Sequence, residues 1–196
     1  GDKVIKRIFF CHFVQCFEAL AARDSPWGKD VIWSRDYEKD FVVFDRPNPV
    51  NAYDYEGTIL NLSYRSFVGY YPIVQRHGMT IGEISLLFNN EYGIGCKLHV
   101  LKMENYKRDM YYRDTNLLWA MPSPNFPTPD TAITYNATCI FEGTNVSEGR
   151  GTTAPFEYVG APFINPYKLS EGNNTINTNN IINNVYLKQL NIKLII

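Results

Sequence analysis

Residues 142–157, EGTNVSEGRGTTAPFE, hold the side chains of this sequence that are best suited to chemistry. Glu142 and Glu148 lie six positions apart among glycines. Glycoside hydrolysis needs two carboxyl groups about 5 to 10 Å apart, one of which protonates the leaving oxygen. The segment therefore contains a candidate catalytic pair, although many glycine-rich loops would satisfy the same spacing. The alternative is a solvated turn without a ligand.

Arg150 and Thr152 suggest a second use for the same segment. A guanidinium pairs bidentately with a carboxylate or a phosphate. A threonine hydroxyl and neighbouring glycine N–H groups can complete an anion-binding site. The segment therefore favours recognition of an anionic or hydroxyl-rich ligand.

A second polar group follows the apolar run at 41–44, in FVVFDRPNP. A short, wholly apolar strand is typical of a sheet that is covered on both faces. Open α/β sheets bind ligands beyond the carboxyl ends of their strands. Asp45, Arg46 and Asn48 are therefore candidate binding residues.

Arg76 and His77 form a third candidate group, because they precede a predicted helix. Thr80 and Glu83 form the T-x-x-E capping box of that helix, so Glu83 is interpreted as a cap and not as a catalyst. The positive end of a helix suits an anionic ligand. An exposed pair of residues in a turn is the alternative for Arg76 and His77.

Several classes of function are disfavoured. Nineteen basic and twenty acidic residues nearly cancel, so we expect no nucleic-acid partner, even though YKRDMYYRD (106–114) mixes basic and aromatic residues. Four cysteines without CxxC spacing and three histidines predict no metal site. No phosphate-binding glycine motif and no GxSxG is present, so we expect no nucleotide cofactor and no serine nucleophile. No segment has the roughly 18 to 20 apolar residues of an integral membrane span.

The elements that must position these residues follow from apolar periodicity and from capping signals. The sequence predicts an amphipathic helix over 6–22, then a polar surface loop over 23–40. Beyond the strand at 41–44 and the capped helix, it predicts a strand over 96–103. A rigid proline-rich loop over 122–129 comes next, with a short helix opening at Asp130 or Thr131. The last predicted element is a third strand at 137–141, ATCIF.

Strand, helix and strand in succession predict an α/β layered domain with a largely parallel sheet. We expect this domain to span 1–169. Residues 170–196 are rich in asparagine and poor in acids, which predicts a low-complexity tail.

Four stretches together resemble one known family. They are FDRPNP, EGTILNLSYRSFVGYYPIVQRHGMTIGE, PSPNFPTPDTA and CIFEGTNVSEGRGTTAPFEYVGAPF. In this order they are similar to the NamZ-type exo-β-N-acetylmuramidases, a bacterial family formerly of unknown function. The similarity extends from Phe41 to about Ile164 and weakly includes the helix near 7–22.

The resemblance implies a Rossmann-like catalytic domain and a smaller accessory domain that remove N-acetylmuramic acid from the non-reducing ends of peptidoglycan fragments. It adds Asn125 and Asn145 to the candidate saccharide-binding residues, because both lie inside the matching motifs. It also implies that Arg150 or Arg76 binds the lactyl carboxylate of the sugar, and that the protein works in the bacterial periplasm or extracellular space.

Three departures from the family pattern shape the hypothesis. The resemblance implies a longer amino-terminal part that carries the main candidate acid, and this part has no counterpart here. Residues 23–40 look like an insertion, and the tail from 170 replaces the accessory domain. The domain is therefore expected to be incomplete at both ends, and the chain to hydrolyse muramic glycosides poorly. The alternative hypothesis is a non-catalytic saccharide-binding or structural remnant of the fold.

Overall fold

The structure is a computed structural model that describes residues 34–66, 69–165 and 167. The chain divides into two compact units, residues 1–117 and 118–196, and each is described by itself. The helix expected over 6–22 and the tail expected over 170–196 lie outside the described residues. Within the described ranges, no helix is both long and apolar enough to cross a membrane.

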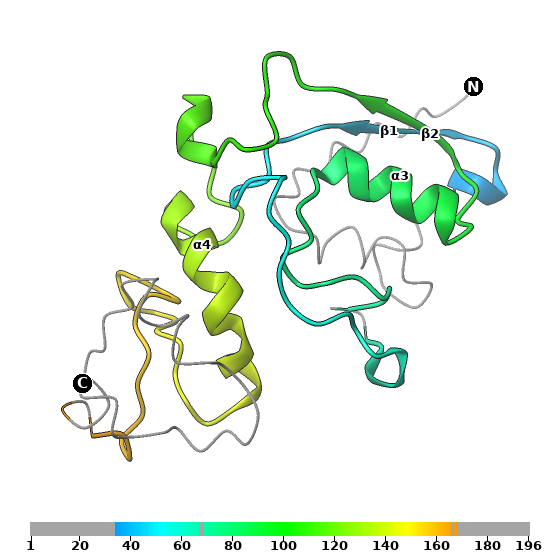
Figure 1. Ribbon diagram of the computed structural model, residues 1–196. Coiled ribbons are helices and arrows are strands. Elements are labelled where there is room, and N and C mark those ends of the chain that lie inside the picture. The colour runs from blue at the N-terminus through cyan, green and yellow to red at the C-terminus, as the bar shows by residue number, and fades with distance from the viewer. Residues whose placement is uncertain (1–33, 67–68, 166, 168–196) are drawn as a thin grey trace. The chain divides into compact units, whose positions relative to one another are not determined.

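The first unit is built around a β-α-β arrangement (Figure 1). Strands β1 and β2 pair in parallel as a two-stranded sheet, in a register that runs from Asp40 opposite Lys97 to Phe44 opposite Leu101. This confirms the predicted α/β fold with a parallel sheet. Among the residues that the structure describes, the elements of the unit are β1 (Asp40–Phe44), η1 (Leu62–Tyr64), α3 (Ile81–Glu91), β2 (Lys97–Leu101) and η2 (Tyr112–Thr115).

The segment ahead of β1 is more ordered than the predicted loop. Residues 34–36 are helical, and Asp40 is already the first residue of the strand. The Ser34 hydroxyl donates a hydrogen bond to the carbonyl of Lys39 at 2.6 Å, which closes the turn between helix and strand. The prediction of a loop through residue 40 is therefore wrong for these last positions, because short-range hydrogen bonds organise a polar stretch that has no apolar period.

Helix α3 begins where its capping box predicts. The Glu83 N–H donates to the Thr80 hydroxyl oxygen, and the Glu83 carboxylate accepts the Thr80 N–H, which completes the capping box. The helix ends at Glu91, and Gly93 follows with a φ of 67°. Glycine adopts this left-handed conformation at no steric cost, so it stops the helix.

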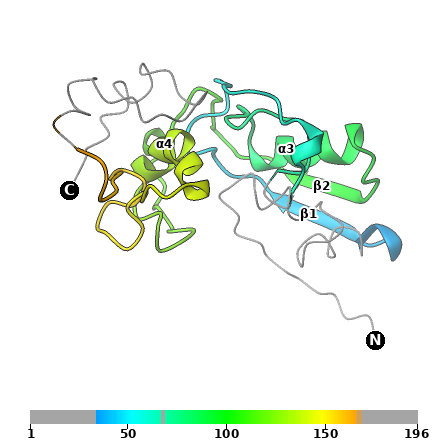
Figure 2. The same ribbon diagram turned by 90° about the horizontal axis from the view of Figure 1, so that it is seen from below.

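The core of the first unit lies between α3 and one face of the sheet (Figures 1 and 2). Ile84 and Phe88 of α3 have no exposed surface, and they cluster with Val43 of β1. Gly82 allows the helix to approach the sheet closely, because a Cβ atom there would lie 2.6 Å from Val100 Cγ1 and 2.8 Å from Asp45 Cγ. The amino end of α3 is therefore fixed against the carboxyl ends of both strands.

The second unit contains α4 (Pro129–Thr138) and the 3-10 helix η3 (Cys139–Gly143). Proline occupies the first turn of α4, and the Thr128 side chain accepts the N–H of Thr131, so the helix begins slightly before the predicted position. The predicted strand over 137–141 is wrong, because these residues end α4 and form η3. Cys139 is accordingly half-buried in a helical turn and does not lie in a strand. The apolar run was too short for its period to separate a strand from a helix.

Candidate functional site

Asp45 directly follows β1, and its carboxylate links the strand to the start of α3. Its Oδ1 accepts the N–H groups of Gly82 at 2.8 Å and Arg46 at 2.9 Å. Its Oδ2 accepts the hydroxyl of Thr80 at 3.0 Å. The amino end of a helix favours a negative charge, so Asp45 holds the loop beyond β1 in a fixed position.

A pocket of about 640 Å³ lies at the carboxyl ends of β1 and β2. Asp45 and Arg46 line it beyond β1, and the loop after β2 supplies the facing residues. The polar lining residues are Asp45, Arg46, Glu104, Asn105, Asp114 and Thr115. The apolar and aromatic lining residues are Phe44, Pro47, Met103, Tyr106, Met110 and Leu117. Such a mixture of apolar surface and a few convergent polar groups is typical of a small-molecule site.

Asn48 lies beside this pocket and has a structural task. Its Nδ2 donates to the carbonyl of Met79 at 2.9 Å, and its Oδ1 accepts the N–H of Val50 at 3.1 Å. Burial raises the pKa of the nearby Tyr106 phenol, whose buried hydroxyl has no hydrogen-bond partner among the described residues. Asn48 therefore shapes the site by holding the backbone.

Arg76 is the centre of a network inside the first unit. Its guanidinium lies 3.2 Å from a carboxylate oxygen of Asp54 and 3.2 Å from one of Glu56. It also donates to the carbonyl of Val50 at 3.0 Å and to the Tyr111 hydroxyl at 3.4 Å. Only 16% of the side chain is exposed. Arg76 therefore links loops of the first unit. The alternative reading of the sequence, in which Arg76 and His77 form an exposed pair in a turn, does not describe its surroundings.

His77 is half-buried, and burial lowers its pKa from 6.5 to about 4. Its Nδ1 accepts the N–H of Met79 at 3.1 Å, which requires this nitrogen to be unprotonated. The neutral imidazole therefore stabilises the loop that leads into α3.

We expect the stability of the chain to fall as the pH decreases through the range between these two pKa values. The folded pKa lies below the unfolded one, so unfolding takes up a proton in this range, and stability is complete only above the unfolded pKa. Urea unfolding followed at several pH values measures the effect. His77→Gln should flatten this part of the profile, whereas His99→Gln, at an exposed position, should leave it unchanged. A profile that His77→Gln does not alter would contradict the assignment.

In the second unit, Arg150 lies between the two candidate catalytic glutamates. Its Nε donates to Glu148 Oε1 at 2.5 Å, and its Nη2 donates to Glu142 Oε1 at 2.6 Å. The Glu148 side chain is 11% exposed, compared with 38% for Glu142. The structure therefore brings together the three residues that the sequence singled out. It also places a guanidinium between the carboxylates, where a glycosidase would hold the scissile bond.

Glu142, Glu148 and Arg150 form a triad, and the loop that carries it, the triad loop, packs around Phe156. Phe156 is fully buried with a φ of 63°, which is rare for a bulky side chain. Its N–H donates to the carbonyl of Glu148 at 2.6 Å, and its carbonyl accepts the Thr138 hydroxyl at 3.0 Å. The Arg150 guanidinium lies 5.0 Å from the centre of its ring. Backbone strain of this kind clusters at functional sites, and here it fixes the position of Arg150.

The remaining candidates of the second unit differ in their surroundings. The Thr152 hydroxyl donates to the carbonyl of Gly149 at 2.6 Å, so it stabilises the turn. Asn145 is exposed between η3 and the triad loop, and Asn125 is half-buried in the proline-rich loop. The candidate residues are divided between the two units. The first unit contains Asp45, Arg46, Asn48, Arg76 and His77, and the second contains Asn125, Glu142, Asn145, Glu148, Arg150 and Thr152.

Sequence reasoning missed the wall of the pocket that follows β2. Glu104, Tyr106 and Asp114 line it, whereas the sequence suggests no role for Glu104 and only a disfavoured nucleic-acid surface for 106–114. The useful signal was positional: residues after the second of two parallel strands must lie beside those after the first. Arg108 fixes this segment, because it pairs with Glu83 and donates to the carbonyl of Gly78 at 2.9 Å. The described ranges contain no group of three His, Cys, Asp or Glu side chains that could hold a metal ion.

The fold is that of an α/β protein with a pocket beyond the carboxyl ends of its parallel strands. Two sequence profiles identify the family: "Exo-beta-N-acetylmuramidase NamZ, N-terminal" matches residues 31–130, and "Exo-beta-N-acetylmuramidase NamZ, C-terminal" matches residues 133–190. The chain therefore belongs to the NamZ family. The two profiles meet between residues 130 and 133, earlier than the domain boundary at 169 expected from the sequence. The boundary at 169 stays a prediction.

Known relatives agree with this assignment. The chain is 53% identical over 136 residues to the peptidoglycan beta-N-acetylmuramidase NamZ of Bacillus subtilis strain 168, and the match covers 69% of this chain and 33% of that protein. Two crystal structures of DUF1343 family proteins from Bacteroides fragilis are also similar. One has a TM-score of 0.69 at 35% identity, covering 74% of this chain and 38% of the other. The second has a TM-score of 0.61 at 39% identity, covering 67% and 37%. The chain thus spans about a third of the length of the curated relative that it matches.

Proposed function

We propose that this chain carries part of the saccharide site of an exo-acting β-N-acetylmuramidase, which releases N-acetylmuramic acid from the non-reducing ends of peptidoglycan fragments. The observation that carries the proposal is the pocket beyond β1 and β2, where acidic and amide side chains face apolar ones. Family membership and the similarity to a peptidoglycan beta-N-acetylmuramidase support it.

The chemistry of the lining suits a sugar. Carboxylates such as Glu104 and Asp114 accept hydrogen bonds from hydroxyl groups, and Phe44 and Met103 offer apolar surface to the C–H faces of a pyranose ring. Arg46 is the one cation among the lining residues named for this pocket. It is therefore the group there that can pair with the carboxylate of N-acetylmuramic acid.

The triad of Glu142, Glu148 and Arg150 favours a second candidate function, namely saccharide binding without hydrolysis. The Arg150 guanidinium occupies the space between the carboxylates, and each of them already accepts one of its hydrogen bonds. Catalysis by Glu142 and Glu148 would require Arg150 to leave this position when substrate enters. We propose that the chain alone binds the sugar and turns over an aryl N-acetylmuraminide far more slowly than a full-length relative.

Calorimetric titration of the chain with N-acetylmuramic acid tests the proposal. Glu104→Gln keeps the shape of the lining but removes a charged acceptor, and we expect about tenfold weaker binding, equivalent to about 1.4 kcal/mol. Glu91→Gln is the matched control, because Glu91 is exposed at the end of α3 and is not part of the pocket lining.

Arg150→Ala distinguishes the two possible locations of the site. Weaker binding from Glu104→Gln alone would place the sugar in the pocket of the first unit. Weaker binding from Arg150→Ala alone would move it to the triad loop, as the sequence suggested. Absence of any binding would refute a saccharide site in this chain, and rapid hydrolysis of the aryl glycoside would refute the binding-only candidate.

A further inference from the structure

Arg150 in the triad loop pairs with two carboxylates that are held in different ways. The Glu148 side chain is 11% exposed, and its Oε1 accepts the Arg150 Nε–H at 2.5 Å. The Glu142 side chain is 38% exposed, and its Oε1 accepts an Nη2–H of Arg150 at 2.6 Å. One partner of the guanidinium is therefore enclosed by the loop, whereas the other lies at the surface.

The pairing of Glu148 with Arg150 is a fixed feature of the loop. A charge that is shielded from water is costly to leave without its partner. The backbone around Glu148 is also held in place, because its carbonyl accepts the Phe156 N–H at 2.6 Å. The neighbouring Ser147 exchanges two backbone hydrogen bonds with Gly160, at 2.8 and 2.9 Å. Glu148 therefore stays in contact with Arg150 when other groups around the guanidinium move.

The Glu142 side chain, by contrast, can be released to solvent. An exposed ion pair contributes little to stability, because water solvates both charges once they separate. Glu142 lies near the end of the short helix η3. A Cβ atom added to the following Gly143 would meet no atom of the described residues within 4 Å, apart from those of its chain neighbours. The carboxylate of Glu142 therefore has room to turn away from Arg150.

Release of Glu142 would leave one edge of the guanidinium ready for another acceptor. Glu148 occupies Nε, and the guanidinium carbon lies 5.0 Å from the centre of the Phe156 ring. The two terminal nitrogens remain, and their parallel N–H groups match the two oxygens of a carboxylate. A carboxylate restores the single charge that Glu142 carried, whereas phosphate, with more than one charge at neutral pH, would repel Glu148. The edge therefore suits a ligand with one carboxylate group.

We propose that the triad loop is a carboxylate-binding site that Glu142 closes, so that the carboxylate of a ligand displaces Glu142 from Arg150 while Glu148 holds the guanidinium in place. Glu142 is then an internal competitor of the ligand and not a catalytic group. The apparent affinity of such a site is reduced by the fraction of molecules in which it is closed. The inference rests on the proposed function only in its choice of a sugar probe.

Titration of the ¹⁵N-labelled full chain with sodium lactate, followed by NMR, tests the site. The Arg150 Nε–H signal and the Gly149 and Gly151 amide signals report binding at this loop. Glu142→Gln should tighten lactate binding about three- to fivefold, the factor expected when an exposed ion pair worth up to about 1 kcal/mol no longer competes. Glu157→Gln removes the same charge from the same segment, where Glu157 Oε1 accepts the Thr131 hydroxyl at 3.3 Å, and should leave the affinity unchanged.

Two sugars distinguish this site from the proposed saccharide function. N-acetylmuramic acid carries a lactyl carboxylate, and N-acetylglucosamine does not. Glu142→Gln should tighten binding of the first sugar and leave binding of the second unchanged. If neither sugar binds but lactate still binds more tightly to Glu142→Gln, the carboxylate site stands and the saccharide function fails. If N-acetylmuramic acid binds equally well to the unaltered chain and to Glu142→Gln, the saccharide function stands and the carboxylate site fails.

Three further results would overturn the proposal. The first is lactate binding that Glu142→Gln weakens or leaves unchanged, because Glu142 would then not compete with the ligand. The second is equal tightening by Glu157→Gln, which would indicate a general effect of charge. The third is a larger shift of the loop signals with inorganic phosphate than with lactate, which would contradict the ligand class. Arg150→Lys keeps the charge but loses the planar fork, and should weaken lactate binding at least about tenfold.

Discussion

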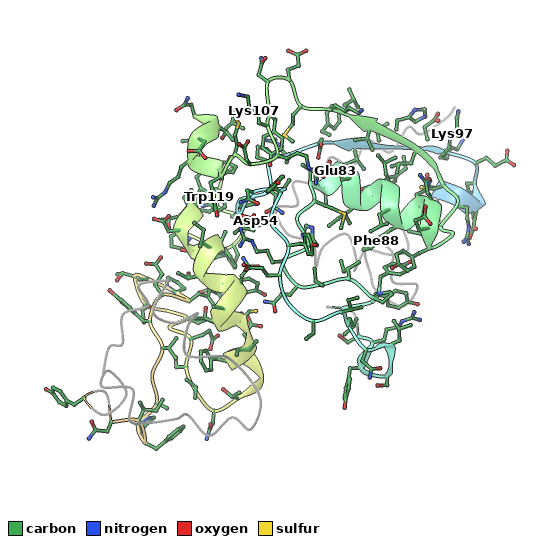
Figure 3. The ribbon with its side chains drawn as sticks, viewed as in Figure 1. Asp54, Glu83, Phe88, Lys97, Lys107 and Trp119 are labelled. Atoms are coloured by element: carbon green, nitrogen blue, oxygen red, sulfur yellow. The ribbon has the colours of Figure 1, made fainter. Side chains whose placement is uncertain are left out.

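Phe88→Ala is expected to lower the free energy of unfolding by about 3 to 5 kcal/mol, the usual cost of emptying a buried aromatic position. The side chain has no exposed surface. Its ring centre lies 4.4 Å from that of Tyr71 and 5.7 Å from that of Tyr92. Figure 3 marks its position on α3. Because alanine leaves a cavity at this position, Tyr71 and Tyr92 lose contacts with the ring that they cannot replace. Urea unfolding followed by circular dichroism measures the loss.

Leu86→Ala is the matched control for this prediction. Leu86 belongs to the same helix but is 38% exposed, so truncation there leaves no closed cavity and should cost less than about 1 kcal/mol. An equal loss in the two variants would mean that the helix as a whole is weakly held, and that Phe88 is not the centre of the core.

Asp45→Ala is expected to lower the free energy of unfolding by about 2 to 3 kcal/mol and to abolish measurable binding in the pocket. Three donors lose their acceptor: the N–H groups of Arg46 and Gly82 and the hydroxyl of Thr80. The loop beyond β1 then loses its connection to the start of α3. Calorimetric titration and urea unfolding on one preparation measure the two effects.

Asp40→Ala is the control for Asp45→Ala. It removes a carboxylate from the other end of the same strand, where Asp40 is 51% exposed and pairs with Lys97 and His99. An exposed ion pair contributes at most about 1 kcal/mol. If Asp45→Ala proved as mild as this control, the position of the loop would not depend on the carboxylate.

The first unit was predictable from sequence because its signals are local and agree with one another. The capping box at Thr80 and Glu83 set the start of α3, and the apolar run before Asp45 set the position of β1. The second unit was less predictable. Residues 137–141 are apolar enough for a strand, but the helix opened by Thr128 and Pro129 continues into them, and tertiary packing of Thr138 and Phe141 decides the outcome.

The candidate site was predicted in its residues more than in its contacts. Asp45 and Arg46 lie at the pocket, as their position after an apolar strand suggested. The pairing of Arg76 with Asp54 and Glu56 could not be foreseen, because these partners are about twenty positions away in an irregular segment. The same holds for Phe156, whose left-handed backbone brings Arg150 onto its ring.

The wide sequence separation of the paired strands has a consequence for synthesis on the ribosome. β1 is complete at Phe44, yet its partner begins only at Lys97. Until Lys97 has been made, DFVVF lacks the only strand with which it pairs among the described residues, and a run of high β-propensity in that state can pair with other nascent chains. Asp40 precedes its apolar residues, and Asp45, Arg46 and Pro47 follow them. Charges and a proline at such borders oppose intermolecular pairing, so the residues that build the pocket in the folded chain also protect the strand before it has a partner.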